Sequence, residues 1–199
     1  MKIYDEIEQN TDEWKKCRSG HFTASMFSKL FMAKSTAGYR GAISQVVIEK
    51  LTGEVPESYQ SAAMRRGHEL EPEAIEAYEL RTFNKVKRVG FIERDNFCGC
   101  SPDGIVGLDG GVEIKCPEAT AFLEYLETGK IKDDYVYQIQ GSLWVSERVW
   151  WDYSPYSPKL TAPIVRVYRD EGMIANIATA VAVATEEARK RIIRIQAMK

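Results

Sequence analysis

Two carboxylates and a lysine stand at a spacing that can support metal-dependent hydrolysis. Asp103 follows a proline, and ten residues later comes Glu113, with Lys115 two positions beyond it. The segment between them is rich in glycine and centred on Leu108, which is typical of a hairpin turn. In a hairpin centred there, residues whose numbers sum to 216 face each other. Asp103 would then lie opposite Glu113, with their Cβ atoms about 5 Å apart.

Facing carboxylates destabilise a sheet unless something compensates their charge. Because side chains alternate along a strand, Lys115 projects to the same face as Glu113. Mg²⁺ is commonly held by one or two carboxylates together with a substrate phosphate. A lysine beside such an ion can orient or deprotonate the attacking water, and neighbouring cations lower its pKa. Taken alone, the same three residues also fit the wet face of an ordinary exposed hairpin.

A further acidic residue, Glu71, lies on a helix expected over residues 62–80. It shares the i, i+3, i+4, i+7 face with apolar residues such as Ala74 and Tyr78, whereas the neighbouring glutamates share a face that is typical of solvent exposure. A carboxylate that is directed inward among apolar side chains needs a partner, because an unpaired buried charge is costly. Glu71 is therefore a candidate for the same acidic site.

Positive charge is concentrated near the N-terminus. The 199 residues carry 27 Lys and Arg against 29 Asp and Glu, a formal net charge of −2. The small net charge excludes the class of proteins that coat nucleic acid through bulk electrostatics, so any binding of nucleic acid must depend on a local group of cations. Residues 14–48 contain six Lys and Arg and no Asp or Glu. A guanidinium such as that of Arg18, together with a hydroxyl at a helix start such as that of Ser25, can bind phosphate.

Four segments together resemble the PD-(D/E)XK nuclease superfamily and, within it, the lambda exonuclease or YqaJ-like viral recombinase branch. They occur in the family's order and at compatible spacings from Trp14 to Trp144. The segments are W-x3-R-x-G-x2-TAS over 14–25, GxxxExxA over 67–74, PD followed by ExK over 102–115, and QxQ over 138–140.

The resemblance implies a role for individual residues. Asp103, Glu113 and Glu71 would hold two Mg²⁺ ions roughly 4 Å apart, with the backbone carbonyl of Ile114 as an extra ligand and Mn²⁺ as a substitute ion. Lys115 would act on the attacking water. Gln138 would assist Lys115, and Gln140 is the second candidate for this role. Arg18 and Ser25 would hold the 5′-phosphate of a DNA end.

The resemblance also implies an activity. It indicates a Mg²⁺-dependent exonuclease that degrades linear double-stranded DNA 5′ to 3′ and leaves 3′ single-stranded overhangs for phage-type single-strand annealing recombination. It further implies a homotrimer, an annealing protein as partner, and the cytoplasm of a bacterial host, with a phage or prophage origin. Two alternatives remain open: a site-specific or structure-specific endonuclease with the same core, and a non-catalytic module that binds DNA ends.

The elements that must position these residues alternate between helices and strands. The pattern predicts an α/β (α+β) protein with a restriction-endonuclease-like core, in which helices flank a central mixed sheet within a single domain over residues 1–199. Hydroxyls at Thr23 and Ser25 are expected to cap a helix. Helices are expected over 26–31, 43–51, 62–80, 119–128, 135–146 and 172–198, and strands over 85–94, 96–107, 111–117, 148–154 and 162–169.

Several other classes of protein and site are disfavoured. No run approaches the roughly 18 to 20 apolar residues of a membrane span, and the acidic N-terminus is unlike a signal sequence. The four cysteines lack a paired CxxC spacing, so we expect reduced thiols rather than disulfides or an iron–sulfur cluster. His21 and His68 have no mutual metal-binding spacing and are expected to be packed or exposed residues.

Overall fold

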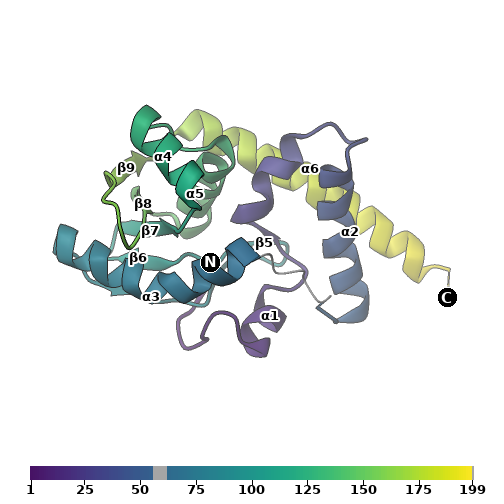
Figure 1. Cartoon of the computed structure of the whole chain (residues 1–199). Helices are drawn as coiled ribbons and strands as arrows, with labels where there is room; N and C mark the ends of the chain where they lie inside the picture. Colours follow the sequence, from purple (N-terminus) through teal and green to yellow (C-terminus); the bar gives the residue numbers. More distant parts are fainter. Residues whose placement is uncertain (56–61, 199) are drawn as a thin grey trace.

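The computed structural model describes residues 1–55 and 62–198 (Figure 1). The first half of the chain forms β1 (Lys2–Tyr4), α1 (Asp12–Arg18), β2 (Phe22–Thr23), the 3-10 helix η1 (Ala24–Phe31), α2 (Ala37–Thr52), α3 (Ala62–Thr82), β3 (Val86–Lys87), β4 (Phe91–Asp95) and β5 (Cys98–Cys100). The second half forms β6 (Gly104–Val106), β7 (Gly110–Lys115), α4 (Ala119–Thr128), α5 (Asp133–Ser146), β8 (Trp150–Pro155), β9 (Val165–Tyr168) and α6 (Glu171–Gln196).

The strands form two mixed sheets with helices packed against them. One sheet has the order β1-β4-β5-β2 and the other β3-β6-β7-β8-β9. In the second sheet, β7 and β8 are parallel, and the chain between them forms α4 and α5. The predicted fold class, a mixed α/β core flanked by helices, is confirmed. The prediction of one central sheet is wrong, because the strands are divided between two.

The β6–β7 hairpin has the predicted register. Gly104 lies opposite Val112 and Val106 lies opposite Gly110. The chain reverses through Gly107 and Leu108. The φ at position 107 is +55°, a conformation that favours glycine, and Leu108 is 91 % exposed. Continued by one residue beyond β6, this register places Asp103 opposite Glu113.

The strands expected over 85–94 and 96–107 are each broken in two, and this is the source of the second sheet. The first break is at Gly90, whose close approach to the backbone of Ile7 leaves no room for a Cβ. The second is at Pro102, which has no N–H for a sheet ladder. Gln9 joins the two breaks, because its Nε2 donates to the carbonyls of Val89 at 2.9 Å and Pro102 at 2.7 Å.

Most helices begin and end near the predicted residues, and α4 has the predicted bounds of 119–128. The segment 135–146, whose composition also suits a strand, is helical within α5. The prediction of a hydroxyl cap on the next helix is wrong: Thr23 is the N-cap of η1 but makes no side-chain capping bond. Its Oγ1 lies 3.3 Å from Ser25 Oγ instead. The N-terminal elements β1, α1 and β2 were not predicted.

Helix α5 contacts η1, α6 and strands of both sheets. Its Ile139 and Leu143 are fully buried, and a Cβ on Gly141 would lie 2.4 Å from the Phe27 ring of η1. This close contact holds α5, which carries Gln138, against η1. Figure 1 shows α6 running from α4 and α5 to α2, beyond which its C-terminal end projects.

The four cysteines are free thiols, as predicted, and two of them, Cys98 and Cys100, are buried in β5. Within the described ranges, no helix combines the length and apolar character that crossing a membrane requires.

Candidate active site

Asp103 and Glu113 meet at the open end of the β6–β7 hairpin. β6 begins only at Gly104, so Asp103 does not extend the backbone ladder. It uses its side chain instead, and its Oδ2 accepts a hydrogen bond from the Ile114 amide at 2.6 Å. Glu113 is 1 % exposed. The hairpin therefore brings the two carboxylates of the PD and ExK segments together.

Two side chains hold one oxygen of the Glu113 carboxylate. Lys115 forms an ion pair with Oε1, and Gln138 Nε2 donates to the same atom at 2.7 Å. The other oxygen, Oε2, is buried and has no hydrogen-bond partner among the described residues. Buried polar atoms are almost always paired, so this oxygen is a candidate ligand atom.

Glu71 approaches the same site from α3. Its side chain is 13 % exposed, and Arg88 Nη2 lies 2.6 Å from its Oε1. Ala74 and Tyr78, which share its helix face, are buried, as the predicted orientation requires. Arg88 follows β3 and was not singled out in the sequence, because nothing in its local pattern indicates a partner on a distant helix.

Burial and mutual repulsion make the charged forms of these carboxyl groups unfavourable. Burial raises the pKa of Glu113 to about 7, where Asp103 adds to the effect and Lys115 opposes it. Burial also raises the pKa of Asp103 and of Glu71, and for Glu71 the charge on Asp103 contributes. Burial alone would lower the pKa of Lys115, but Glu113 and Asp103 outweigh it and raise the pKa. Among the protein's own groups, Lys115 is therefore held as an ammonium and not activated as a base.

This donor set fits a divalent cation. A cation would relieve the repulsion between the carboxylates and would give the unpaired Glu113 oxygen a partner. The Ile114 carbonyl faces the same edge, because the N–H and C=O of one strand residue point to the same side. Over residues 1–55 and 62–198, no three His, Cys, Asp or Glu side chains already converge as a metal centre. Arg88 and Lys115 each pair with one oxygen of a carboxylate, so a cation bound at Glu71 and Glu113 would compete with these ion pairs for the carboxylate charge.

Arg18 is connected to the acidic site through a tryptophan. Its guanidinium lies 4.3 Å from the ring centroid of Trp14. Trp14 Nε1 lies 2.9 Å from the Gly90 carbonyl and 3.0 Å from Ser101 Oγ, two residues before Asp103. No carboxylate in the described part of the chain pairs with Arg18, and burial lowers its pKa. An unpaired guanidinium in this position is suited to an anionic ligand.

The turn after Arg18 is held by a buried carboxylate. Gly20 has a φ of +73°, and its amide donates to Glu49 Oε2 at 2.6 Å. Ser25 is exposed at the start of η1, where its hydroxyl lies beside that of Thr23. Among the described residues, Ser25 and Arg18 make no direct contact with each other. These contacts link Arg18 through Trp14 to Ser101, and they leave the predicted phosphate-binding roles of Arg18 and Ser25 untested.

The two glutamines of the QxQ segment have different environments. Gln138 contacts Glu113, whereas the buried Gln140 donates to the Tyr168 carbonyl at 2.8 Å and accepts from the Asp170 amide at 3.0 Å. Gln140 thus joins α5 to the end of β9 and the start of α6. The sequence reasoning also missed Tyr135, whose ring centroid lies 5.0 Å from Lys115 Nζ. Its position one helical turn before Gln138 was the available signal.

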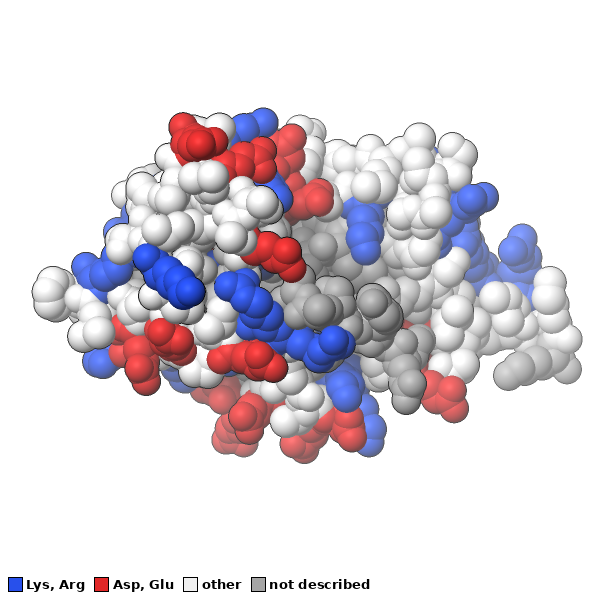
Figure 2. Space-filling view, in the orientation of Figure 1, with Lys and Arg blue, Asp and Glu red and all other residues white. Residues whose placement is uncertain are grey.

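Positive charge on the face in Figure 2 is interleaved with negative charge. Basic side chains run across the middle of this face, over α3, and acidic side chains lie beside them. The face is thus unlike a continuous basic surface, in agreement with the small net charge of the chain. On this face, contacts with nucleic acid would depend on individual cations and not on a continuous basic surface.

Comparison with known proteins agrees with this geometry. The chain is 33 % identical to an alkaline exonuclease from Laribacter hongkongensis, over 94 % of this chain and 97 % of that chain, with a TM-score of 0.87. A second structure of that enzyme, in complex with dAMP, matches equally well. A phage-related exonuclease from Haemophilus somnus shares the fold at 17 % identity and a TM-score of 0.63, covering 88 % of this chain and 96 % of that chain. No curated protein sequence matches the chain.

A family model adds evidence that is independent of the solved structures. The model of the YqaJ-like viral recombinase domain matches residues 13–149, which span every segment of the candidate site from Trp14 to Gln138. More than half of the chain is covered, and a solved exonuclease matches almost its whole length. The chain therefore belongs to the YqaJ-like viral recombinase family and is a nuclease.

Proposed function

We propose that this nuclease is a Mg²⁺-dependent exonuclease that removes nucleotides 5′ to 3′ from the ends of linear double-stranded DNA and leaves 3′ single-stranded overhangs. The observation that carries the proposal is the buried, unpaired Oε2 of Glu113, with Asp103 beside it at the open end of the hairpin and Glu71 close enough for its charge to act on Glu113. Lys115 and Gln138 lie directly against this cluster. Such a cluster is suited to phosphodiester hydrolysis.

The acidic residues have the role of ligands. Asp103, Glu113 and Glu71, with the Ile114 carbonyl, would hold two Mg²⁺ ions, for which Mn²⁺ would substitute. Bound Mg²⁺ supplies charge that polarises the scissile phosphate, generates the nucleophile and stabilises the leaving 3′ oxygen. The cost of keeping these carboxyl groups buried and charged is thereby offset when the ions bind.

Lys115 and Gln138 have the role of positioning the attacking water. Gln138 donates its amide N–H to Glu113, which leaves its amide oxygen free to accept a hydrogen bond from water. Lys115 is held as an ammonium beside Glu113 and can donate to the water or to a phosphate oxygen. Cations bound nearby would lower its pKa and allow it to take a proton.

Arg18 supports the proposed polarity of digestion. Its unpaired guanidinium, which lies over the Trp14 ring, would bind the terminal 5′-phosphate through two parallel N–H donors. Ser25, at the start of η1, would add a hydroxyl. A terminal phosphate bound there would set which strand end reaches the acidic residues.

The family and its solved relative support a biological setting. The family description is that of a viral recombinase, and the relative from Laribacter hongkongensis is an exonuclease that binds dAMP. We therefore place this nuclease in single-strand annealing recombination of a phage or prophage, in the cytoplasm of a bacterial host. This setting predicts that the nuclease forms a homotrimer and that its partner is a single-strand annealing protein.

Digestion of three DNA substrates with and without Mg²⁺ tests the proposal. Linear duplexes would carry either a 5′-phosphate or a 5′-hydroxyl, and covalently closed circles would serve as the third substrate. Faster Mg²⁺-dependent loss of the phosphorylated linear DNA, with intact circles, is the expected result. Cut circles would identify an endonuclease, and no digestion of any substrate would identify a DNA-end-binding module.

A further inference from the structure

Arg88 is a half-exposed cation at the edge of the acidic site. It follows β3, which pairs antiparallel with β6. Continued by one residue, the register of this pair places Arg88 opposite Gly104, the neighbour of Asp103. Glu79 of α3 holds the start of β3, because its Oε1 accepts a hydrogen bond from the Val86 amide at 2.7 Å. The fold therefore holds Arg88 beside both α3 and the PD segment.

The contact between Arg88 and Glu71 is an ion pair without a well-formed hydrogen bond. Arg88 Nη2 lies 2.6 Å from Glu71 Oε1. This oxygen is buried and nevertheless has no hydrogen-bond partner among the described residues, so the N–H groups of the guanidinium are not directed at it. Burial raises the pKa of Asp103, and the charge of Arg88 is among the effects that oppose burial there. Arg88 thus acts on two carboxylates by charge and leaves the Glu71 oxygen suited to a metal ion.

The guanidinium has donors available for a second anion. The side chain of Arg88 is 47 % exposed, and Glu71 is its one acidic partner within ion-pair distance in the described part of the chain. A guanidinium carries five N–H donors in a planar fork that matches the oxygens of a phosphate. A divalent cation at Glu71 would offset the carboxylate charge and so weaken the attraction between Arg88 and Glu71.

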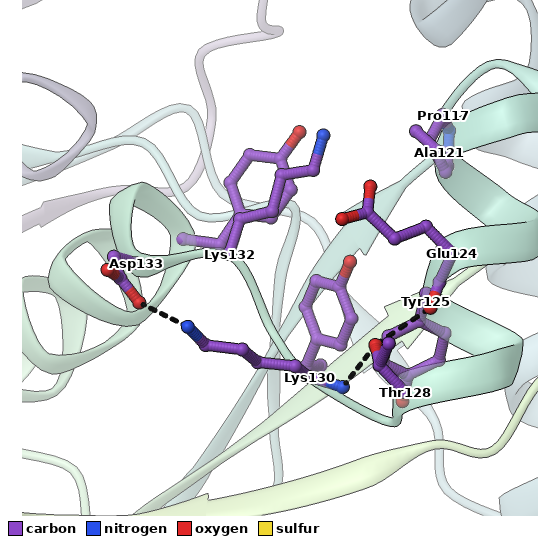
Figure 3. A pocket seen from close by; sticks show the side chains of 10 residues that line it. Pro117, Ala121, Glu124, Tyr125, Thr128, Lys130, Lys132 and Asp133 are labelled. Atoms are coloured by element: carbon purple, nitrogen blue, oxygen red, sulfur yellow. Dashed lines mark hydrogen bonds and ion pairs between the residues drawn. The ribbon is translucent and has the colours of Figure 1, made fainter.

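The lysines of the pocket between α4 and α5 are less suited to a phosphate, because they have carboxylates of their own (Figure 3). Lys130 pairs with Asp133 at 3.7 Å. Figure 3 shows Lys132 and Glu124 reaching toward this pocket from opposite sides. Two lysines are thus matched by two carboxylates, and the pocket has little net attraction for an anion. Arg88 differs from these lysines because its partner is itself a candidate metal ligand.

We propose that Arg88 pairs with Glu71 while the acidic site holds no metal ion, and binds a phosphate of the DNA strand when a divalent cation occupies Glu71. This inference rests on the proposed metal-dependent function and adds to it a phosphate-binding residue that no family segment assigns. The exchange of Arg88 between its two partners couples the binding of metal to the binding of DNA, so that each favours the other.

Calorimetric titration of Mg²⁺ into the full chain without DNA tests the first partner independently of cleavage. Arg88→Met should bind Mg²⁺ roughly tenfold more tightly than wild type, because a nearby like charge is removed. The rise in melting temperature that Mg²⁺ causes should also be larger in this variant. Arg88→Lys keeps the charge and should bind Mg²⁺ as wild type does. Lys87→Met is the matched control, because this neighbouring cation pairs with Asp5 at 2.6 Å; it should also leave Mg²⁺ affinity unchanged.

The salt dependence of duplex binding tests the second partner. Affinity for a 5′-phosphorylated duplex would be measured at several salt concentrations, once with Ca²⁺, which also takes oxygen ligands, and once with EDTA. With Ca²⁺, Arg88→Met should reduce the slope of log affinity against log salt by about 0.9, the value for one lost phosphate contact. With EDTA, the same substitution should leave the slope unchanged, because Arg88 is then paired with Glu71. Lys87→Met should have the wild-type slope in both solutions.

Three results would overturn the proposal while leaving the exonuclease function intact. They are equal Mg²⁺ affinity in wild type and Arg88→Met, equal salt slopes of the two proteins with Ca²⁺, and a slope that falls in Arg88→Met as much with EDTA as with Ca²⁺. Absence of Mg²⁺ binding in both proteins, together with no digestion of DNA, would instead refute the proposed function and this inference with it.

Discussion

Arg18→Ala should remove the preference for a 5′-phosphate while leaving the fold intact. Arg18 has no carboxylate at ion-pair distance among the described residues; burial lowers its pKa and only the more distant charge of Glu49 opposes this, so the folded chain gains little ion-pair stabilisation from it. Its packing interaction is the contact with Trp14 at 4.3 Å. Loss of a cation–π contact costs about 0.5 to 1 kcal/mol, and relief of a partly buried, unpaired charge opposes that loss. The free energy of unfolding should therefore change by less than about 1 kcal/mol.

The effect on selectivity should be much larger. Hydrogen bonds to charged groups contribute about 1.5 to 3 kcal/mol, which corresponds to about 10-fold to 150-fold in affinity. The ratio of kcat/KM for 5′-phosphorylated over 5′-hydroxyl duplex should fall by that factor in Arg18→Ala. Arg18→Lys should recover part of it, because an ammonium keeps the charge but lacks the paired donors.

Initial rates on the two linear duplexes measure the selectivity of each variant. Urea denaturation measures its free energy of unfolding. Lys15→Ala is the matched control, because Lys15 is an exposed cation on the same helix that pairs with Asp12. It should keep the full selectivity. An equal loss of rate on both duplexes in Arg18→Ala, or a loss of selectivity in Lys15→Ala, would refute the assignment of the phosphate to Arg18.

Further predictions concern the acidic site and two supporting residues. Lys115→Ala should reduce cleavage by at least about 10²-fold while duplex binding persists in gel-shift assays, and cleavage at the wild-type rate would contradict the site. Mg²⁺ should raise the melting temperature of wild type but not of Asp103→Asn, because a ligand stabilises only a fold that binds it; an equal rise in both would exclude Asp103 as a ligand. Gln140→Leu should lower the free energy of unfolding by about 2 kcal/mol and leave kcat unchanged, because Gln140 joins α5 to β9 and α6. Gln138→Leu should lower kcat. The reverse result would assign the structural role to Gln138 and the role in cleavage to Gln140. Burial lowers the pKa of His21 below its ordinary value of 6.5, so the unfolded chain binds the proton more readily and stability should be lost as the pH falls below 6.5. Denaturation above and below that pH should show a flatter dependence in His21→Gln, and identical slopes would refute this origin.

The parts of the site that depend on local geometry could be predicted from the sequence. The turn at Gly107 and Leu108 sets the register of the hairpin, and strand alternation then places Glu113 and Lys115 on one face. Helical periodicity likewise directs Glu71 inward. Each of these inferences needs only residues that are close together in the chain.

Contacts between distant segments could not be predicted in the same way. Arg88 reaches Glu71 only because β3 returns beside α3, and Tyr135 reaches Lys115 only because α5 packs over the end of β7. Arg88 has no local pattern that differs from that of a solvent-exposed side chain, and the one signal for Tyr135 was its position one helical turn before Gln138. Their role depends on the tertiary packing, which hydrophobic periodicity alone leaves undetermined.

The division into two sheets, which the sequence pattern did not predict, has a direct consequence for the site. At the break after β5, Ser101 turns its hydroxyl to Trp14 Nε1, and at the break before β4 the Gly90 carbonyl accepts from the same indole. A continuous strand would have committed the Gly90 carbonyl to a sheet ladder and left the indole with one partner fewer. The crossing between sheets is therefore what fixes Trp14, and with it Arg18, beside the segment between β5 and β6 that carries Asp103. If this is correct, Trp14→Phe, which keeps a ring beneath Arg18 but loses both hydrogen bonds, should lower selectivity for the 5′-phosphate through Arg18 while leaving Mg²⁺ stabilisation unchanged.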